Sequence, residues 1–262
     1  MKLPREGFVL EYADEGVGPP IVFLHSMGTR SEIWQPQADA LAHRFRVIRL
    51  DTRGHGHSDS PPGRYTLKQL GDDVRALLDY LSIARAHIVG LSAGGFIAQA
   101  FACAHPSRVS SLVLAGTACR YPPETIGKWE ARIKLVEAQG MEPVARAVPD
   151  SVFSPAFVLA RPDVVERTAN MMRDCDPAGY IGVCAALPAL DFKAALGALR
   201  VPALIIAGEV DKPLPVPLSR ELCDAIPGAT LCIVAGAGHF ISIEQPEIFT
   251  GLLIEFLDSL KY

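Results

Sequence analysis

Short apolar runs alternate with longer amphipathic segments along the first part of the chain. The runs that have the length and β-branched composition of buried strands lie at residues 21–25, 45–50 and 87–91. Between them, apolar residues recur at helical spacing over 31–43 and 66–81, and Ser31 and Thr66 stand where a helix N-cap is expected. Strands that alternate with helices in this way predict βαβ units and a largely parallel sheet.

A different pattern interrupts the strands in the middle of the chain. Residues 109–115 predict a further strand, but over 119–199 the strand-like runs stop and Ala-rich, helix-favouring segments are broken repeatedly by proline. The later elements are strands at 203–207 and 230–234, with helices at 93–104, 218–225 and 246–260. We therefore expect 119–199 to be a helical insertion into one sheet, not a second independent domain.

A serine stands at the junction between a predicted strand and a predicted helix. Residues 90–94 have the sequence G-L-S-A-G, which fits the G-x-S-x-G pattern of a nucleophile held on a sharp strand-to-helix turn. Such a turn needs glycines where side chains would collide with neighbouring backbone. The pattern could arise by chance in a chain with 22 glycines, but its position favours Ser92 as a nucleophile.

A serine hydroxyl is a weak nucleophile and needs a positioned base, which in turn needs an acidic partner. The order expected with this turn is serine, acid, histidine. Asp211, in G-E-V-D, and His239, in G-A-G-H-F, each follow a predicted strand, at the sheet edge where α/β proteins bind ligands. We predict that Ser92, Asp211 and His239 are catalytic, with Glu209 and Asp191 as alternative acids.

Acyl transfer also needs donors for a developing oxyanion, usually backbone N–H groups. The residue after the nucleophile, Ala93, is the first candidate. The loop after the strand at 21–25 supplies the second, and Met27 is the expected donor, although its side chain could equally line the pocket. Ser26 in the same loop is expected to contact substrate.

Three histidines suggest a metal site at first sight. His25, His55 and His57 lie within one stretch of sequence that also holds Asp51. However, His55 and His57 belong to a Gly-rich turn, and no two histidines have the i, i+4 spacing of a helical metal motif. We therefore predict neither a metal nor another cofactor.

Composition and charge restrict the partners. The chain has 262 residues, 49% hydrophobic and 21% charged, which suits one large globular domain or one domain with an insertion. A net charge of −4 without charge blocks argues against nucleic acid and membrane, and favours a small-molecule partner. Residues 7–14 are too charged for a signal peptide, and the six cysteines form no C-x-x-C pair, so we expect a cytoplasmic protein with reduced thiols.

Taken together, five segments resemble those of α/β-hydrolases. They are L-H-S-M-G at 24–28, D-T-R-G-H-G-H-S at 51–58, G-L-S-A-G-G at 90–95, G-E-V-D at 208–211 and G-H-F at 238–240. The resemblance implies the α/β-hydrolase fold, in which helices flank a mostly parallel central sheet and a helical cap is inserted after the sixth strand. Residues 1–118 and 200–262 would then form the core domain and 119–199 the cap.

A narrower resemblance is to the 3-oxoadipate enol-lactonases, which open an enol-lactone ring in the β-ketoadipate pathway of aromatic catabolism. It rests on residues 51–67, 77–87, 128–133 and 243–250. The resemblance implies that Ser92 attacks a small lactone or ester with His239 as base. The oxyanion would lie between the amides of Ala93 and Met27, and water would then hydrolyse the acyl-enzyme.

The predicted cap should fold over Ser92 and determine specificity, because an insertion at this point packs above the strand ends. Trp129, in K-W-E-A-R-I, either packs within the protein or forms a wall of the substrate pocket. Arg132 or Lys128 would face a substrate carboxylate, or else be solvated.

Two other functions remain open. One is a general carboxylesterase or acyl-lactone hydrolase with a different pocket, and the other is a ligand-binding relative that has lost turnover. A haloalkane dehalogenase is disfavoured, because its chemistry needs a carboxylate at the position of Ser92.

Overall fold

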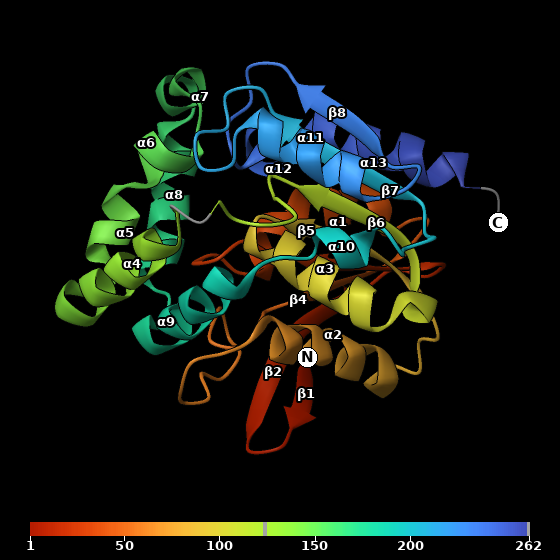
Figure 1. Cartoon of the computed structure of the whole chain (residues 1–262), viewed down its shortest axis with the longest axis horizontal. Helices are drawn as coiled ribbons and strands as arrows, with labels where there is room; N and C mark the ends of the chain where they lie inside the picture. The colour runs from red at the N-terminus through yellow and green to blue at the C-terminus, as the bar shows by residue number, and fades with distance from the viewer. Residues whose placement is uncertain (123–124, 261–262) are drawn as a thin grey trace.

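Eight strands form one sheet in the computed structural model, which describes residues 1–122 and 125–260 (Figure 1). They are β1 (Lys2–Arg5), β2 (Phe8–Glu15), β3 (Pro20–Leu24), β4 (Arg46–Leu50), β5 (Ala86–Leu91), β6 (Val109–Ala115), β7 (Ala203–Gly208) and β8 (Thr230–Val234). Their order across the sheet is β1-β2-β4-β3-β5-β6-β7-β8. The pairs β1–β2 and β2–β4 are antiparallel, and the pairs from β4 to β8 are parallel. The predicted, mostly parallel sheet is confirmed.

The six strands predicted from apolar runs correspond to β3–β8, and no boundary differs by more than one residue. The first two strands were not predicted. In β2, the sequence F-V-L-E-Y-A-D-E carries three acidic residues, and only Leu10 and Tyr12, two positions apart, are buried. An antiparallel strand near the edge of a sheet needs only one buried face, so it lacks the continuous apolar run of a central parallel strand.

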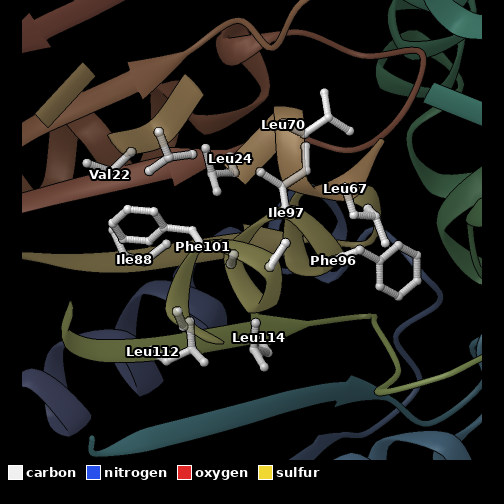
Figure 2. Close-up of a cluster of buried hydrophobic side chains, with 14 of the residues drawn as sticks. Val22, Leu24, Leu67, Leu70, Ile88, Phe96, Ile97, Phe101, Leu112 and Leu114 are labelled. Atoms are coloured by element: carbon white, nitrogen blue, oxygen red, sulfur yellow. The ribbon is translucent and has the colours of Figure 1, made fainter. Parts of the chain in front are cut away.

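Helices cover both faces of the sheet and bury two apolar clusters. On one face lie α2 (Leu67–Tyr80), α3 (Ala93–Ala104) and α11 (Val216–Ala225), and on the other lie α1 (Gln35–Leu41) and α13 (Pro246–Ser259). Alternate residues of β3 enter opposite clusters: Val22 and Leu24 join the first, Ile21 and Phe23 the second. Figure 2 shows the first cluster, where side chains of α2 and α3 meet β3, β5 and β6. Each fully buried aliphatic side chain contributes about 1.5–3 kcal/mol.

Helix α2 begins where the sequence predicted an N-cap. Thr66 occupies the N-cap, and its Oγ1 accepts a hydrogen bond from the Gln69 N–H at 3.2 Å. The Gln69 side chain accepts in return from the Thr66 N–H at 2.9 Å, which completes a capping box. The prediction that Thr66 caps this helix is confirmed.

The prediction that Ser31 caps a helix over 31–43 is wrong. A 3₁₀ turn, η1 (Ser31–Trp34), precedes α1, and Arg30 occupies the N-cap position of that turn. The Ser31 N–H donates to Asp51 Oδ1 at 2.7 Å. A carboxylate from the loop after β4 therefore binds the Ser31 backbone, and the α-helix begins only afterwards.

Between β6 and β7, the elements of the described residues are helices. They are α4 (Ile126–Gln139), α5 (Glu142–Arg146), α6 (Val148–Val152), α7 (Pro155–Ala160), α8 (Pro162–Arg173), α9 (Pro177–Ala186), η4 (Leu187–Ala189) and α10 (Lys193–Leu196). In Figure 1 helices α4 to α9 gather in green to one side of the sheet, whereas α10 lies against α3 and α11. The helical insertion after the sixth strand is thereby confirmed.

The insertion leaves and rejoins the core at one place. Arg120 and Asp191 form an antiparallel bridge, and the Phe192 N–H donates to the Cys119 oxygen at 2.9 Å. The predicted boundaries, 119–199 for the cap with 1–118 and 200–262 for the core, stay a prediction. Residues 123 and 124 of that cap, and 261 and 262 of that core, lie outside the described residues.

Glycines allow the insertion to touch the core backbone. Gly54 has φ +77°, and a Cβ there would lie 2.4 Å from the Gly179 Cα in α9. Nearby, the Tyr65 N–H donates to the Gly182 oxygen at 3.0 Å. The Gly-rich turn that holds His55 therefore lies directly against α9.

No helix in the described ranges 1–122 and 125–260 is long and apolar enough to cross a membrane. The six cysteines are free thiols. Burial raises the pKa of Cys175 and of Cys184 to about 12, so both remain protonated at neutral pH.

Two buried histidines should make the fold sensitive to acid. Burial lowers the pKa of His55 to about 3 and that of His87 to about 4. An unfolded histidine titrates near about 6.5, so below that pH the unfolded chain binds protons that the folded chain excludes. We expect the free energy of unfolding to fall as the pH falls, by up to about 1.4 kcal/mol per pH unit for each histidine.

Urea unfolding at pH 7.5, 6.0 and 5.0 measures this slope. In His87→Gln the slope should be shallower than in the wild-type protein. In His43→Gln, which changes an exposed histidine, it should be unchanged. A slope in His87→Gln equal to that of the wild type would contradict the assignment.

Candidate active site

The candidate site lies at the carboxyl ends of the central parallel strands. The chain runs from β3 to β4 on one side of β3, and then to β5 on its other side, so the direction of winding reverses between β3 and β5. Loops diverge at such a point and leave a crevice in which α/β sheets bind ligands. The loop after β3 carries Met27, and Ser92 directly follows β5.

Ser92 occupies a strained turn between β5 and α3. Its backbone has φ 53° and ψ −113°, a left-handed conformation that costs on the order of 1–3 kcal/mol in a residue other than glycine. The Ser92 N–H donates to the Ala115 oxygen of β6 at 2.9 Å. A Cβ at Gly94 would lie 2.1 Å from the Leu24 oxygen, so only glycine permits this close approach. Tight packing thus holds the serine side chain at the strand end.

The three residues predicted to be catalytic form a continuous chain of hydrogen bonds. His239 Nε2 lies 2.9 Å from Ser92 Oγ, and His239 Nδ1 lies 2.8 Å from Asp211 Oδ2. An ionised carboxylate only accepts, so Nδ1 carries the proton and Nε2 is left to accept from the serine hydroxyl. Asp211 and His239 are each about 95% buried, which protects the pair from competition by water.

A backbone N–H also fixes the carboxylate of Asp211 on the side away from His239. Its Oδ1 accepts from the Leu214 N–H at 2.8 Å. Glu209 is exposed and accepts from the Gly236 N–H, while Asp191 is exposed and accepts from the Lys193 N–H. The structure therefore brings Asp211, and neither alternative, to His239.

The loop that carries Met27 is ordered by a buried histidine. The Thr52 N–H donates to His25 Nε2 at 3.0 Å, so His25 Nδ1 carries the proton and donates to the Ser26 oxygen at 2.8 Å. Burial lowers the pKa of His25, which keeps the ring neutral. The sequence suggested a metal ligand at His25 and placed it in the L-H-S-M-G segment, but gave no sign of these hydrogen bonds. Its hydrogen bonds instead identify it as a support for the loop.

The two predicted oxyanion donors belong to the helix that follows Ser92 and to a loop that lines the same cavity. Ala93 is the first residue of α3, and the first N–H groups of a helix have no partner within it. The helix dipole adds a partial positive charge at this end. Met27 lines the same cavity as Ser92, and its sulfur lies 3.5 Å from Cys184 Sγ. Both backbone amides thus belong to segments that border the nucleophile.

A cavity of about 240 Å³ opens onto Ser92 and His239. Ser26, Met27, Leu214 and Phe240 contribute to its wall from the core segments, and Tyr121, Lys128, Trp129, Arg132, Val144, Met172 and Tyr180 contribute from the segment between β6 and β7. Its volume lies below the range of roughly 300–1,000 Å³ that holds drug-sized ligands, so it suits a small substrate. The described residues that line it include two cationic side chains and no acidic one.

Trp129 and Arg132 both border this cavity, and both also pack against neighbours. The Trp129 ring lies 5.4 Å from that of Tyr121, and the Arg132 guanidinium donates to the Tyr180 hydroxyl at 3.1 Å. Burial raises the pKa of both Tyr121 and Tyr180, so both phenols are neutral. The two tyrosines were missed by sequence reasoning, because neither Tyr121, which precedes α4, nor Tyr180 in α9 gives any sign in the sequence of the cavity it faces.

The histidines that suggested a metal site do not form a metal-binding group. The rings of His25 and His55 lie 5.5 Å apart, but each is buried with a lowered pKa, and His57 is exposed. In the part of the chain that the structure describes, no group of three His, Cys, Asp or Glu side chains could hold a metal. That the protein needs no metal stays a prediction.

Comparison with known proteins gives one family. The model of the alpha/beta hydrolase fold family matches residues 19–246. The 3-oxoadipate enol-lactonase 2 of Acinetobacter baylyi is 36% identical over 252 residues, which cover 94% of this chain and 92% of that protein. A protein of Azorhizobium caulinodans, provisionally named as the carbamate hydrolase RutD, is 30% identical over 94% of each chain.

A solved structure agrees with these relatives. The crystal structure of the enol-lactonase from Burkholderia xenovorans superposes with a TM-score of 0.94 at 36% sequence identity. The match covers 99% of this chain and 100% of that chain. The similarity therefore extends over the core and the inserted helices together.

Proposed function

The chain belongs to the alpha/beta hydrolase family, and on this premise we propose that it is a serine hydrolase that opens a small lactone or ester. The substrate we propose is 3-oxoadipate enol-lactone or a close analogue. The observation that carries the proposal is the hydrogen-bonded chain Ser92–His239–Asp211 at the wall of a small, cationic cavity. We also propose that the enzyme acts in the cytoplasm without metal, cofactor, membrane or nucleic-acid partner.

In the first step, Ser92 Oγ attacks the lactone carbonyl carbon while His239 Nε2 takes the hydroxyl proton. Asp211 stabilises the resulting imidazolium through Nδ1. The carbonyl oxygen becomes an oxyanion, which accepts from the backbone amides of Met27 and Ala93; each such donor is worth about 3–4 kcal/mol of the barrier. The ring C–O bond then breaks, and the departing enol oxygen takes the proton from His239.

In the second step, water attacks the acyl carbon and gives a proton to His239. The bond to Ser92 Oγ breaks, the serine regains the proton, and a carboxylate product forms. Because the leaving enol stays attached to the acyl group, it could attack again and reclose the ring. Conversion of the enol to its keto form removes that nucleophile, so the product does not reclose.

Two cationic side chains in the cavity wall favour a substrate that carries a carboxylate. Lys128 and Arg132 both border the cavity, and Arg132 is oriented by the Tyr180 hydroxyl. A guanidinium can hold a carboxylate through two parallel hydrogen bonds. We propose that Arg132 binds the substrate carboxylate, while Trp129 and Ser26 contact the ring, under a cap formed by 119–199.

Trp129→Ala should raise KM for 3-oxoadipate enol-lactone by more than about tenfold, which equals about 1.4 kcal/mol of binding. The reason is that the indole would lose its contact with a flat, conjugated ring. The KM for p-nitrophenyl acetate should change little, because this neutral ester has no carboxylate by which Arg132 would hold it against that wall. Steady-state kinetics on both substrates makes the comparison. Equal losses on both, together with a lowered Tm, would show that Trp129 only packs.

A panel of substrates tests the proposed function. It should contain 3-oxoadipate enol-lactone, neutral γ-lactones, an acyl-homoserine lactone, p-nitrophenyl esters and a carbamate. We expect kcat/KM to be highest for the lactone that carries a carboxylate. Preference for neutral esters would instead indicate a general carboxylesterase, and absence of turnover on every substrate would favour a ligand-binding relative.

A further inference from the structure

A buried carboxylate behind His239 has no part in the mechanism above. Glu244 is the last residue of α12 (Ile241–Glu244) and is only 9% exposed. Its Oε1 accepts from the Gly238 N–H at 2.9 Å and from the Ser154 N–H at 3.2 Å, and its Oε2 accepts from Ser154 Oγ at 2.7 Å. One side chain therefore binds both the segment that carries His239 and a segment of the inserted helices.

The same two segments are also joined directly. The His239 N–H and the Phe240 N–H both donate to the Val152 oxygen, at 2.9 and 3.2 Å. The rings of Phe153 and Phe240 pack edge to face, with centroids 5.8 Å apart. Three consecutive N–H groups, those of residues 238–240, are thus held by Glu244 and Val152.

This arrangement leaves little freedom to the catalytic loop. A Cβ at Gly238 would lie 2.5 Å from Glu244 Oε1 and 2.7 Å from the Ser154 N–H nitrogen, so the contact is close on all sides. Ser154 in turn caps α7, because its Oγ accepts from the Phe157 N–H at 3.2 Å. Burial raises the pKa of Glu244, while the hydrogen bonds from Ser154 and Gly238 act in the opposite direction and favour the ionised form.

We infer that Glu244 is a positioning residue, which fastens residues 152–154 to the loop of His239 and so holds the imidazole at hydrogen-bond distance from Ser92. The inference rests on the proposed function, since it assigns Glu244 to the same reaction. Without the carboxylate, two N–H groups and one hydroxyl would be buried without their partner, and the loop would shift to find others. A base displaced by about 1 Å can lose on the order of 100-fold in rate.

The test is the rate at which a fluorophosphonate labels Ser92, because labelling needs the base but not the correct substrate. At 25 °C, and with folding checked by circular dichroism, Glu244→Ala should be labelled about 10- to 100-fold more slowly than the wild type. Glu244→Gln should stay within about threefold of the wild type, because its amide oxygen can still accept from both N–H groups. In Gly238→Ala the added Cβ would push Glu244 Oε1 away from the loop of His239, so the labelling rate should fall as in Glu244→Ala. This second variant provides the test if Glu244→Ala does not fold.

Asp73→Ala is the matched control. Asp73 is also a buried carboxylate, but it pairs with Arg53 and Arg5 on another part of the core. This variant should have a lowered Tm and an unchanged labelling rate. If folded Glu244→Ala were labelled at the wild-type rate, or if labelling of Asp73→Ala were slowed equally, the inference about Glu244 would be overturned and the proposed function would stand. A wild-type protein that is not labelled at Ser92 would overturn the proposed function, and the inference with it.

Discussion

Replacing Ser92 by alanine is expected to lower kcat/KM for 3-oxoadipate enol-lactone by about 10⁴-fold or more. The substitution removes only the hydroxyl that lies 2.9 Å from His239 Nε2, and this hydroxyl is the group that the proposed mechanism uses to form the acyl-enzyme. The turn itself should persist, since its backbone is held by the Ala115 oxygen and by packing around Gly94. Initial rates on purified protein, with Tm measured alongside, check this expectation.

Ser82 offers a matched control for this substitution. It also has a positive φ, 55°, against 53° for Ser92, but it follows α2 and does not border the cavity. Ser82→Ala therefore removes the same hydroxyl from a residue with a similar positive φ. Its turnover should equal that of the wild type. Substantial hydrolysis by Ser92→Ala, above a few hundredths of the wild-type rate, would contradict the proposed nucleophile.

Substitutions in the His239–Asp211 pair are expected to have the next largest effects. His239→Ala removes the base and should cost about 10⁴-fold in kcat. Asp211→Asn should cost a similar or somewhat smaller factor, of about 10³ to 10⁴, because an amide N–H beside Nδ1 favours the wrong tautomer. In that tautomer Nε2 carries the proton and cannot accept one from Ser92. Single-turnover and steady-state rates at pH 8 measure both losses.

Glu209→Gln is the control for Asp211→Asn. The two residues share a loop, but Glu209 is exposed and contacts the Gly236 N–H, not His239. Its substitution should leave turnover nearly unchanged. If turnover by Asp211→Asn were instead close to that of the wild type, and turnover by Glu209→Gln were strongly lowered, the role of the acid would have to be assigned to Glu209.

The sequence predicted the central sheet well because its physical signal is strong. Strands β3 to β7 are parallel and mostly buried, so each appears as an apolar run between helical segments. The edge strand β8 is more exposed, but its sequence T-L-C-I-V is still an apolar run. The hairpin of β1 and β2 was missed for the converse reason, since buried apolar residues in it are few and are separated by charged or partly exposed ones. Ser31 was misassigned because a cap signal in the sequence cannot show that Asp51, from another loop, binds the same N–H.

The residues of the candidate site were likewise predictable only in part. Ser92, Asp211 and His239 could be placed together from sequence, since each follows a parallel strand and those strand ends share one edge. The roles of His25, Tyr180 and Glu244 could not, because each depends on contacts between segments far apart in the chain. Glu244 meets Ser154 across 90 residues, and Arg132 meets Tyr180 across 48. Only the folded arrangement shows which polar groups these contacts satisfy.

The central claim, that Ser92 opens the lactone by forming an acyl-enzyme, is tested most directly by titration with a fluorophosphonate. The residual rate of 3-oxoadipate enol-lactone hydrolysis should fall in proportion to the amount bound and reach zero at one equivalent per chain. Peptide mass spectrometry should place the adduct on Ser92. Undiminished lactone hydrolysis by protein whose Ser92 is fully labelled would contradict the account.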